Sequence, residues 1–412
     1  DPVTPPAPPV ALTGARVFDG TGAAPSDKMT IVIVKGRIQA VGPDGMVRIP
    51  ADAARVDLSG KTVMPGLINT HGHLDAGDEK EPLYDRMNKQ LRTYAQYGVT
   101  TVVTLGDDGK ESVKVRDEND KGDPVRAHLY VSGPAVTAKT VDEAKKAIDA
   151  AADAKVNIIK TRMEGNREDM TPEVYTALIE QAHNRGLRVA AHLYYLRDAK
   201  ALVNAGLDII GHSIRDVDAD AAFIEELKKR NVGYIPTLTR DLSVFQYEST
   251  PEYINDPFFL RGLPNYSAQI ERVKDPALHA KTKANPGTAR AKRQFEQALR
   301  NLKLLSDGGV TIAMGTDSGT NLGQWEGYFE HVELEMMVKA GMTPMQVLVA
   351  ATSGAARTMK LDQQLGTIRP GQQADLLVLN ANPLSDIRNT RQIHSVWIGG
   401  RRLGSGSQRS TN

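Results

Sequence analysis

The chain has 412 residues, of which 40% are hydrophobic and 25% are charged, an ordinary balance for a globular protein that can bury a large core. A net charge of +1 gives no overall field to attract nucleic acid, and no apolar run approaches the roughly 20 residues needed to cross a bilayer, so neither nucleic acid nor a membrane is an expected partner. The absence of cysteine excludes disulfides, thiolate ligands and a cysteine nucleophile, so any metal site must use histidine and carboxylate side chains.

Both ends of the chain have a composition that disfavours regular structure. Residues 1–10 are rich in proline, which predicts an extended leader. The sequence begins at Asp1 rather than at a methionine, so we expect a mature product after removal of a signal peptide, and hence a periplasmic or secreted protein, while a cytoplasmic location stays open. Small polar residues dominate 405–412 and predict a disordered tail.

Two segments near the ends share a pattern typical of β-hairpins. Residues 11–62 and 362–404 are rich in valine, isoleucine, glycine and turn residues, most clearly at 31–38 and 374–379. We therefore predict that the two segments together build one small β-sandwich domain beside the rest of the chain.

Between them, residues 63–361 alternate short apolar runs with longer amphipathic ones. The apolar runs predict eight strands, at 67–70, 100–105, 127–131, 156–160, 188–192, 208–212, 232–236 and 310–315. The amphipathic runs predict helices at 82–97, 140–154, 171–185, 196–205, 218–231 and 292–307. Eight strands with helical crossovers favour an α/β fold with a parallel (β/α)8 barrel of the TIM type. An open doubly wound sheet is the alternative, but no glycine fingerprint of a dinucleotide site supports it.

A long insertion interrupts this alternation after the seventh predicted strand. Residues 241–291 contain several prolines and aromatic residues. Connections of this length are uncommon in compact domains unless they are functional, so we predict a loop or lid on the rim of the barrel.

Residues able to bind a metal stand at the carboxyl ends of the predicted strands, where barrel enzymes place their chemistry. They are His71 and His73 (first strand), Lys160 (fourth), His192 (fifth), His212 (sixth) and Asp317 (eighth). An extended backbone points the alternating imidazoles of His71 and His73 to one side. A His-x-His motif by itself is more often a pair of solvated loop residues. The six residues at strand ends taken together, however, predict a metal centre. Neutral imidazoles and carboxylates suit a divalent ion such as zinc.

This set of motifs resembles the amidohydrolase superfamily of metal-dependent hydrolases over nearly the whole chain. The resemblance rests on PGLINTHGH at 65–73, on His192 and His212, on GTDSG at 315–319 and on the segment 366–376. It implies a distorted β/α barrel, one or two divalent metals, and hydrolysis at carbonyl, amidine or phosphoryl centres. In overall texture the chain is most similar to the prolidase-like metallodipeptidases, although bulky residues follow His192 where small ones are more usual.

Lys160 indicates a centre with two metals. In a crowded mouth with two cations nearby, a lysine amine loses its proton and can add carbon dioxide, giving a carbamate that holds both ions. Similar members of the family use such a carboxylated lysine, whereas the alternative is a lysine that reaches solvent. The bridge would join an ion on His71, His73 and Asp317 to one on His192 and His212. Two such ions, most simply Zn²⁺, would acidify a shared water, and Asp317 would pass its proton to the leaving amine.

The residues that would contact the substrate follow less directly from the sequence. Three arginines that follow strand ends could hold a substrate carboxylate or could pair with neighbouring acids: Arg162, Arg215 and Arg240. Three tyrosines could contact the leaving group or the oxyanion: Tyr194, Tyr195 and Tyr234. The resemblance also implies that a deaminase of this family would carry a glutamate or similar proton shuttle three residues after His192. Tyr195 stands at that position, so deamination is not expected.

The predicted function is therefore hydrolysis of an amide bond in a small molecule, either a peptide or an N-acyl amino acid, as in a dipeptidase. A lactonase or organophosphate hydrolase would use the same binuclear centre and is the main alternative. A non-catalytic binding scaffold is disfavoured because the complete ligand set is present. A homo-oligomer is compatible with the sequence.

Overall fold

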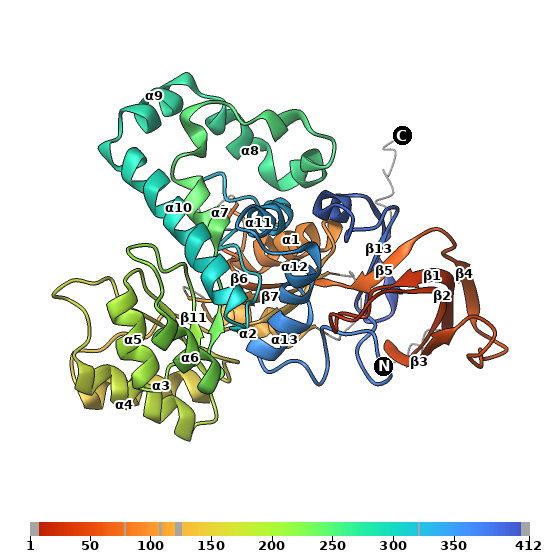
Figure 1. Cartoon of the computed structure of the whole chain (residues 1–412), viewed down its shortest axis with the longest axis horizontal. Helices are drawn as coiled ribbons and strands as arrows, with labels where there is room; N and C mark the ends of the chain where they lie inside the picture. The colour runs from red at the N-terminus through yellow and green to blue at the C-terminus, as the bar shows by residue number, and fades with distance from the viewer. Residues whose placement is uncertain (1–7, 78–79, 107–108, 120–125, 320–321, 405–412) are drawn as a thin grey trace.

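A computed structural model describes residues 8–77, 80–106, 109–119, 126–319 and 322–404 (Figure 1). Most of the predicted leader, residues 1–7, and the predicted tail, 405–412, lie outside the described residues. The leader was placed too far into the chain, because Val10 already belongs to the first strand, β1 (Val10–Val17). Within the described part of the chain, no helix combines the length and apolar character needed to cross a membrane.

The two ends of the chain meet in one eight-stranded sheet with the order β15-β14-β13-β5-β1-β2-β3, in which β4 also pairs with β1. Its other strands are β2 (Ser26–Val34), β3 (Arg37–Pro43), β4 (Ala54–Asp57), β5 (Thr62–Pro65), β13 (Leu376–Leu379), β14 (Ile393–Ile398) and β15 (Arg401–Arg402). β13 runs antiparallel to β5, with Leu377 opposite Met64, and this pairing joins the two terminal segments. A two-layered sandwich and the domain boundaries stay predictions.

The central strands form two parallel sheets instead of one continuous barrel. One sheet contains β6 (Leu67–Gly72), β7 (Val99–Thr104) and β8 (His128–Tyr130), and the other contains β9 (Ile159–Arg162), β10 (Val189–His192), β11 (Ile209–Ile210) and β12 (Gly233–Tyr234). The expected eighth strand at 310–315 makes only isolated contacts, with Ile312 bridged to Tyr234 and the Thr70 N–H bonded to the Met314 carbonyl. The prediction of eight continuous strands is therefore wrong at this segment, although these contacts place it between β12 and β6, directly before the loop of Asp317.

Helices follow the strands and cover the two parallel sheets (Figure 1). They are α1 (Leu83–Gln96), α2 (Lys110–Arg116), α3 (Val141–Asp153), α4 (Pro172–Asn184), α5 (Leu196–Asn204), α6 (Ala221–Lys229), α10 (Pro286–Asp307), α11 (Tyr328–Lys339), α12 (Pro344–Ala350) and α13 (Ser353–Thr358). The six helices that the sequence predicts are all present, whereas α2, α11, α12 and α13 were not predicted. α3 begins where the Thr140 side chain accepts from the Glu143 N–H, an N-cap that satisfies a free backbone donor.

The insertion at 241–291 is helical, so its prediction as a loop was wrong. It contains the end of α7 (Leu238–Ser243), then η1 (Gln246–Glu248), η2 (Glu252–Asn255), η3 (Phe259–Gly262), α8 (Leu263–Val273) and α9 (Pro276–Ala284). Three of its five prolines, Pro264, Pro276 and Pro286, stand in the first turns of α8, α9 and α10, where proline is well tolerated. The aromatic residues form a buried cluster with Tyr97, Trp325 and Tyr328. Figure 1 shows α8 and α9 standing away from the sheets, above α11, with α10 running from α9 down towards the sheets. A role as a lid stays a prediction.

Candidate metal centre

Three of the predicted ligands converge at the carboxyl end of β6. His71 Nε2 lies 3.1 Å from Asp317 Oδ1, and His73 Nε2 lies 2.8 Å from the same oxygen. One ligand atom from each of these residues lies within 4.8 Å of the others. Two imidazoles and a carboxylate are a donor set that suits a borderline divalent ion.

The loop that carries Asp317 is folded tightly onto β6. Asp317 adopts a φ of 60°, in the left-handed region that non-glycine residues rarely occupy, and its N–H donates to the His71 carbonyl at 2.7 Å. Glycines on both sides permit this close approach: a Cβ at Gly315 would lie 2.9 Å from His71 Cβ, and one at Gly319 would lie 2.2 Å from the His73 carbonyl oxygen. The backbone therefore fixes the direction of the Asp317 carboxylate.

The remaining predicted ligands lie beside this group. The rings of His71 and His212 are 4.6 Å apart between centroids, and those of His192 and His212 are 4.4 Å apart. Lys160 is 2% exposed, and its Nζ lies 3.2 Å from His71 Nε2. His212 Nδ1 lies 2.8 Å from the hydroxyl of Thr237, which leaves Nε2 as the free ring nitrogen of that residue.

Burial keeps these histidines in the uncharged form that binds metals. Burial, with Lys160 nearby, lowers the pKa of His71 to about 4 and that of His192 to about 3. Burial also lowers the pKa of His212 well below its ordinary value. For Asp317, burial alone would raise the pKa of the carboxyl, but His71 and His73 hold it well below the ordinary value. At neutral pH the group thus combines uncharged imidazoles with an ionised carboxylate.

Glycines leave room around the end of the Lys160 side chain. A Cβ at Gly211 would lie 3.2 Å from Lys160 Nζ, and one at Gly106 would lie 3.6 Å from Lys160 Cγ. The space that these two residues leave open is where a group added to Nζ would need to fit.

Two of the predicted arginines share one buried acid near the histidines. Nη1 of Arg240 lies 3.1 Å from Asp241 Oδ1, and Nη1 of Arg215 lies 3.5 Å from the same oxygen. The side chain of Arg240 is 31% exposed, whereas those of Arg215 and Asp241 are 6% and 4% exposed. After burial and Lys160, both Arg240 and Arg215 contribute to the lowered pKa of His192.

The other predicted substrate contacts are spread more widely. Tyr194 stacks beneath the Arg215 guanidinium at 4.7 Å and packs against Tyr195, whose ring lies under Arg197. Arg162 is exposed and lines a pocket of about 300 Å³ that also contains Glu164. Tyr234 is completely buried, and its hydroxyl accepts from the Ile214 N–H at 3.0 Å, so its polar atom is engaged by the backbone.

Sequence reasoning missed several polar residues around the centre. Glu164 Oε2 lies 3.7 Å from His192 Nε2, and its position just beyond a strand end was the only signal for it. Thr237 is bonded to His212, and two acids of α11, Glu330 and Glu333, are buried behind the centre. Acids three residues apart among apolar neighbours were a signal that was overlooked because α11 itself was not predicted.

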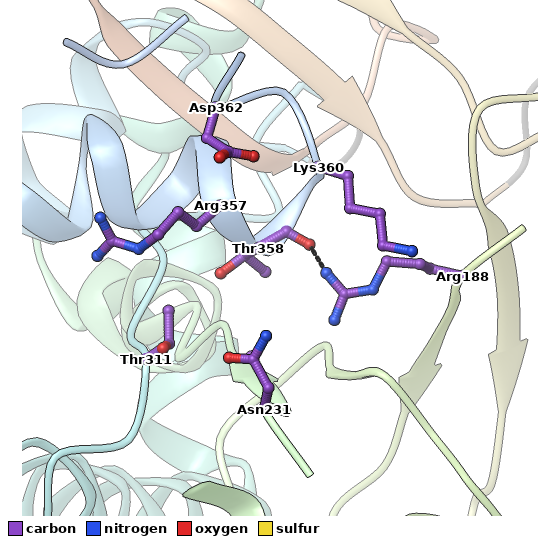
Figure 2. Close-up of a pocket in the computed structure, with 8 residues that line it drawn as sticks. Arg188, Asn231, Thr311, Arg357, Thr358, Lys360 and Asp362 are labelled. Carbon is purple, nitrogen blue, oxygen red and sulfur yellow. Dashed lines mark hydrogen bonds between the residues drawn. The ribbon is translucent and has the colours of Figure 1, made fainter.

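A separate pocket of about 240 Å³ lies at the opposite ends of the strands (Figure 2). Arg188 comes directly before β10, and Gly233 begins β12, so this pocket is at the amino ends of the parallel strands. Its most buried cation, Arg188, donates to the Thr358 carbonyl and pairs with Asp208. The pocket is therefore not part of the metal centre.

Comparison with known proteins agrees with this arrangement. The profile of the amidohydrolase family matches residues 62–403, and the chain belongs to this family. Curated relatives include proteins named ochratoxinase, 5-methylthioadenosine/S-adenosylhomocysteine deaminase and enamidase.

Individual relatives share the fold with low sequence identity. Ochratoxinase from Aspergillus niger is 25% identical over 290 residues, which cover 67% of this chain and only 52% of that protein, so the chain spans about half the length of this curated relative. A solved structure described as a putative prolidase from Bifidobacterium longum is 28% identical, with 96% of this chain and 94% of that chain covered and a TM-score of 0.78. A Xaa-Pro dipeptidase structure with bound methionine is 19% identical, covers 96% of this chain and 99% of its own, and has a TM-score of 0.77.

Proposed function

We propose that the chain is a metal-dependent hydrolase that cleaves the amide bond of a dipeptide or an N-acyl amino acid. The observation that carries the proposal is the convergence of His71, His73 and Asp317, whose ligand atoms lie within 4.8 Å of one another. On this proposal the seven short parallel strands and the segment 310–315 act together as a distorted (β/α)8 barrel, with the ligands at one rim.

The residues would hold two divalent ions, most simply Zn²⁺. His71, His73 and Asp317 would bind the first and His192 and His212 the second, with Lys160 between them. The fit rests on the lowered pKa values of His71, His192 and His212, which favour the uncharged imidazole, and on the absence of a side chain at Gly211 beside Lys160 Nζ. The bridge would form if the Lys160 amine, after losing a proton, made an N–C bond to carbon dioxide and released one further proton, which would leave a carbamate with two oxygen donors.

When bound, the ions would lower the pKa of a water molecule and polarise the carbonyl of the scissile amide. The chain itself supplies the proton transfer: the ionised Asp317 carboxylate accepts the proton of the attacking water and returns it to the nitrogen of the leaving amine. The fixed backbone of the Asp317 loop keeps that carboxylate in one direction throughout, so little reorganisation is needed during the reaction.

Arg240 is the residue that would recognise the substrate carboxylate. Arg215 and Arg240 together carry two positive charges, and Asp241 balances one of them. The excess charge belongs with Arg240, since its guanidinium is the more exposed and lies closer to solvent. A planar guanidinium can bind a carboxylate through two parallel hydrogen bonds.

Metal analysis and a substrate screen test the proposal. The protein loaded with Zn²⁺, Mn²⁺ or Co²⁺ in bicarbonate buffer is offered dipeptides, N-acyl amino acids, lactones and phosphotriesters. Two metal equivalents per chain and preference for amides that bear a free carboxylate support it. Hydrolysis confined to lactones or phosphotriesters would replace it with ester chemistry at the same centre, and a chain that binds no divalent ion would refute it.

A further inference from the structure

The helix α11 lies behind the candidate metal centre and carries two acids into the interior of the protein. Glu330 and Glu333 are both 0% exposed and stand one helical turn apart. An ionised carboxylate without hydrogen bonds is costly to bury, so the partners of these two acids indicate what the acids stabilise. The partners of Glu330 belong to segments that carry candidate ligands, and the partners of Glu333 belong to α7, which begins directly after Thr237, the partner of His212.

Glu330 joins β6 to the loop of Asp317. Its Oε1 accepts from Asn69 Nδ2 at 2.6 Å, from the Thr316 hydroxyl at 2.7 Å and from the Ser318 hydroxyl at 2.9 Å. Thr316 and Ser318 are the two neighbours of Asp317, and Asn69 Oδ1 accepts from the N–H of His71 at 3.0 Å. Glu330 Oε1 thus fixes the residues on both sides of Asp317. It also fixes Asn69, which binds the backbone of His71.

Glu333 holds the start of α7. Its Oε1 accepts from the Leu238 N–H at 2.8 Å, and its Oε2 accepts from the Thr239 N–H at 2.7 Å. The residue just before this helix is Thr237, which adopts a φ of 47° and whose hydroxyl lies 2.8 Å from His212 Nδ1. α7 also carries Arg240, so a single carboxylate fixes both the partner of a histidine ligand and the proposed anchor for the substrate.

We propose that Glu330 and Glu333 are positioning residues with separate roles, an inference that rests on the proposed metal-dependent function. Glu330 sets the directions of His71 and Asp317. Glu333 sets the ring of His212, through Thr237, and the place of Arg240. Residues that orient metal ligands in this way typically change metal affinity about 10- to 100-fold when they are replaced.

The hydrogen bonds predict an unusual difference between glutamine substitutions at the two positions. At Glu330 all three donors reach Oε1, while Oε2 has no partner among the described residues, so E330Q can keep its amide oxygen towards the donors and should stay close to wild type. E330M removes the acceptor. At Glu333 each oxygen faces a backbone N–H, so either orientation of the amide in E333Q directs an NH₂ group at a donor.

The test measures metal affinity and histidine environments separately. Metal-free full-length protein is titrated with Co²⁺ and followed by visible absorption. The same metal-free variants, labelled with ¹⁵N-histidine, report the ring signals of His71 and His212 without any need for metal or activity. E326Q and E326M are the matched controls, because Glu326 is 2% exposed just before α11 and bonds to Asn265 of α8.

The expected pattern distinguishes the two roles. E330M should weaken Co²⁺ binding about 10- to 100-fold and shift the His71 signals, while E330Q stays within about threefold of wild type. E333Q should weaken one equivalent of Co²⁺ by a similar factor, shift the His212 signals and raise KM for a carboxylate substrate. If E330M does not fold, T316V breaks the same network from the opposite side and should reproduce its effects.

Two results would overturn the proposal. One is a pair of variants, E330M and E333Q, whose Co²⁺ affinities and histidine spectra match those of the Glu326 controls. The other is an E330Q protein that is impaired as strongly as E330M, since the role would then depend on charge or packing and not on the single acceptor. If the wild type binds no Co²⁺, the proposed function fails, and the metal-free histidine spectra still decide the positioning roles.

Discussion

The substitution Arg240→Met tests whether the excess positive charge near His192 recognises a substrate carboxylate. Arg240 and Arg215 lie 3.1 and 3.5 Å from one oxygen of Asp241. Removing Arg240 leaves Asp241 paired with Arg215, so the buried acid is still neutralised. Methionine keeps most of the apolar stem of the side chain, and the fold should tolerate the change.

The size of the effect follows from the interaction that is lost. A hydrogen bond to a charged group contributes about 1.5–3 kcal/mol. Since about 1.4 kcal/mol corresponds to a factor of ten, kcat/KM for an N-acyl amino acid should fall about 10- to 150-fold. For the matching substrate whose carboxylate is replaced by a carboxamide, the loss should be less than about threefold, because that substrate lacks the charge.

The assay compares kcat/KM for both substrates in the wild type, R240M and R215M. Arg215 is the control because it is 6% exposed and pairs with the buried Asp241. R215M should lower the melting temperature and reduce kcat/KM for both substrates by similar factors, since breaking a buried ion pair leaves a charge poorly compensated. Equal losses on both substrates in R240M would refute the role given to Arg240.

Three further outcomes are expected. Lys160→Ala should abolish hydrolysis and lower metal content to one equivalent or less, with partial rescue by a short-chain carboxylic acid, and absence of rescue in a folded variant would argue against a carbamate. Gly211→Ala, whose Cβ would lie 3.2 Å from Lys160 Nζ, should reduce bicarbonate-dependent metal binding at least about tenfold, measured by Co²⁺ titration. Burial lowers the pKa of His331 to about 3, so between pH 7 and pH 5 the unfolded chain gains a proton that the folded one excludes, and stability is lost as the pH falls. This histidine accounts for about 2 kcal/mol of the decrease in the free energy of unfolding between pH 7 and pH 5. In urea unfolding, the decrease for His331→Gln should therefore be about 2 kcal/mol smaller than that for the wild type. Equal decreases in the two proteins would contradict the assignment.

The alternation of strands and helices was predictable because local periodicity and burial agree there. The six expected helices appear with their ends displaced by only a few residues, except α10, which begins at Pro286 and not near 292. The segment 310–315 was misjudged because it is apolar like a strand but makes only isolated contacts with Tyr234 and Thr70, which local periodicity does not reveal. The insertion was misjudged because three of its five prolines begin helices, a local role that composition alone does not reveal.

The residues of the candidate site also divide into those that the sequence could place and those that it could not. Candidate ligands such as His73 and Lys160 were predicted to lie close together because strand ends in a parallel sheet meet at one edge, which is a property of topology. The pairing of Arg215 with Asp241 was only one of several options, since two side chains on different elements must be placed before their distance is known. Glu330 and Glu333 could not be assigned a role at all, because their partners are more than ten residues away in the chain.

The two acids of α11 also imply a link between metal binding and substrate binding. Glu333 fixes the start of α7, and this short helix connects Thr237, the partner of His212, with Arg240. If an ion on His212 holds that ring against Thr237, it also restrains the helix that presents Arg240 to a carboxylate. Because such coupling is reciprocal, a bound carboxylate would strengthen retention of that ion by the same factor. Glu330 contacts β6 and the Asp317 loop, and the Thr239 hydroxyl of α7 lies 3.1 Å from the Thr316 carbonyl of that loop, so Glu330 would influence the other ion and reach this link only through Thr316.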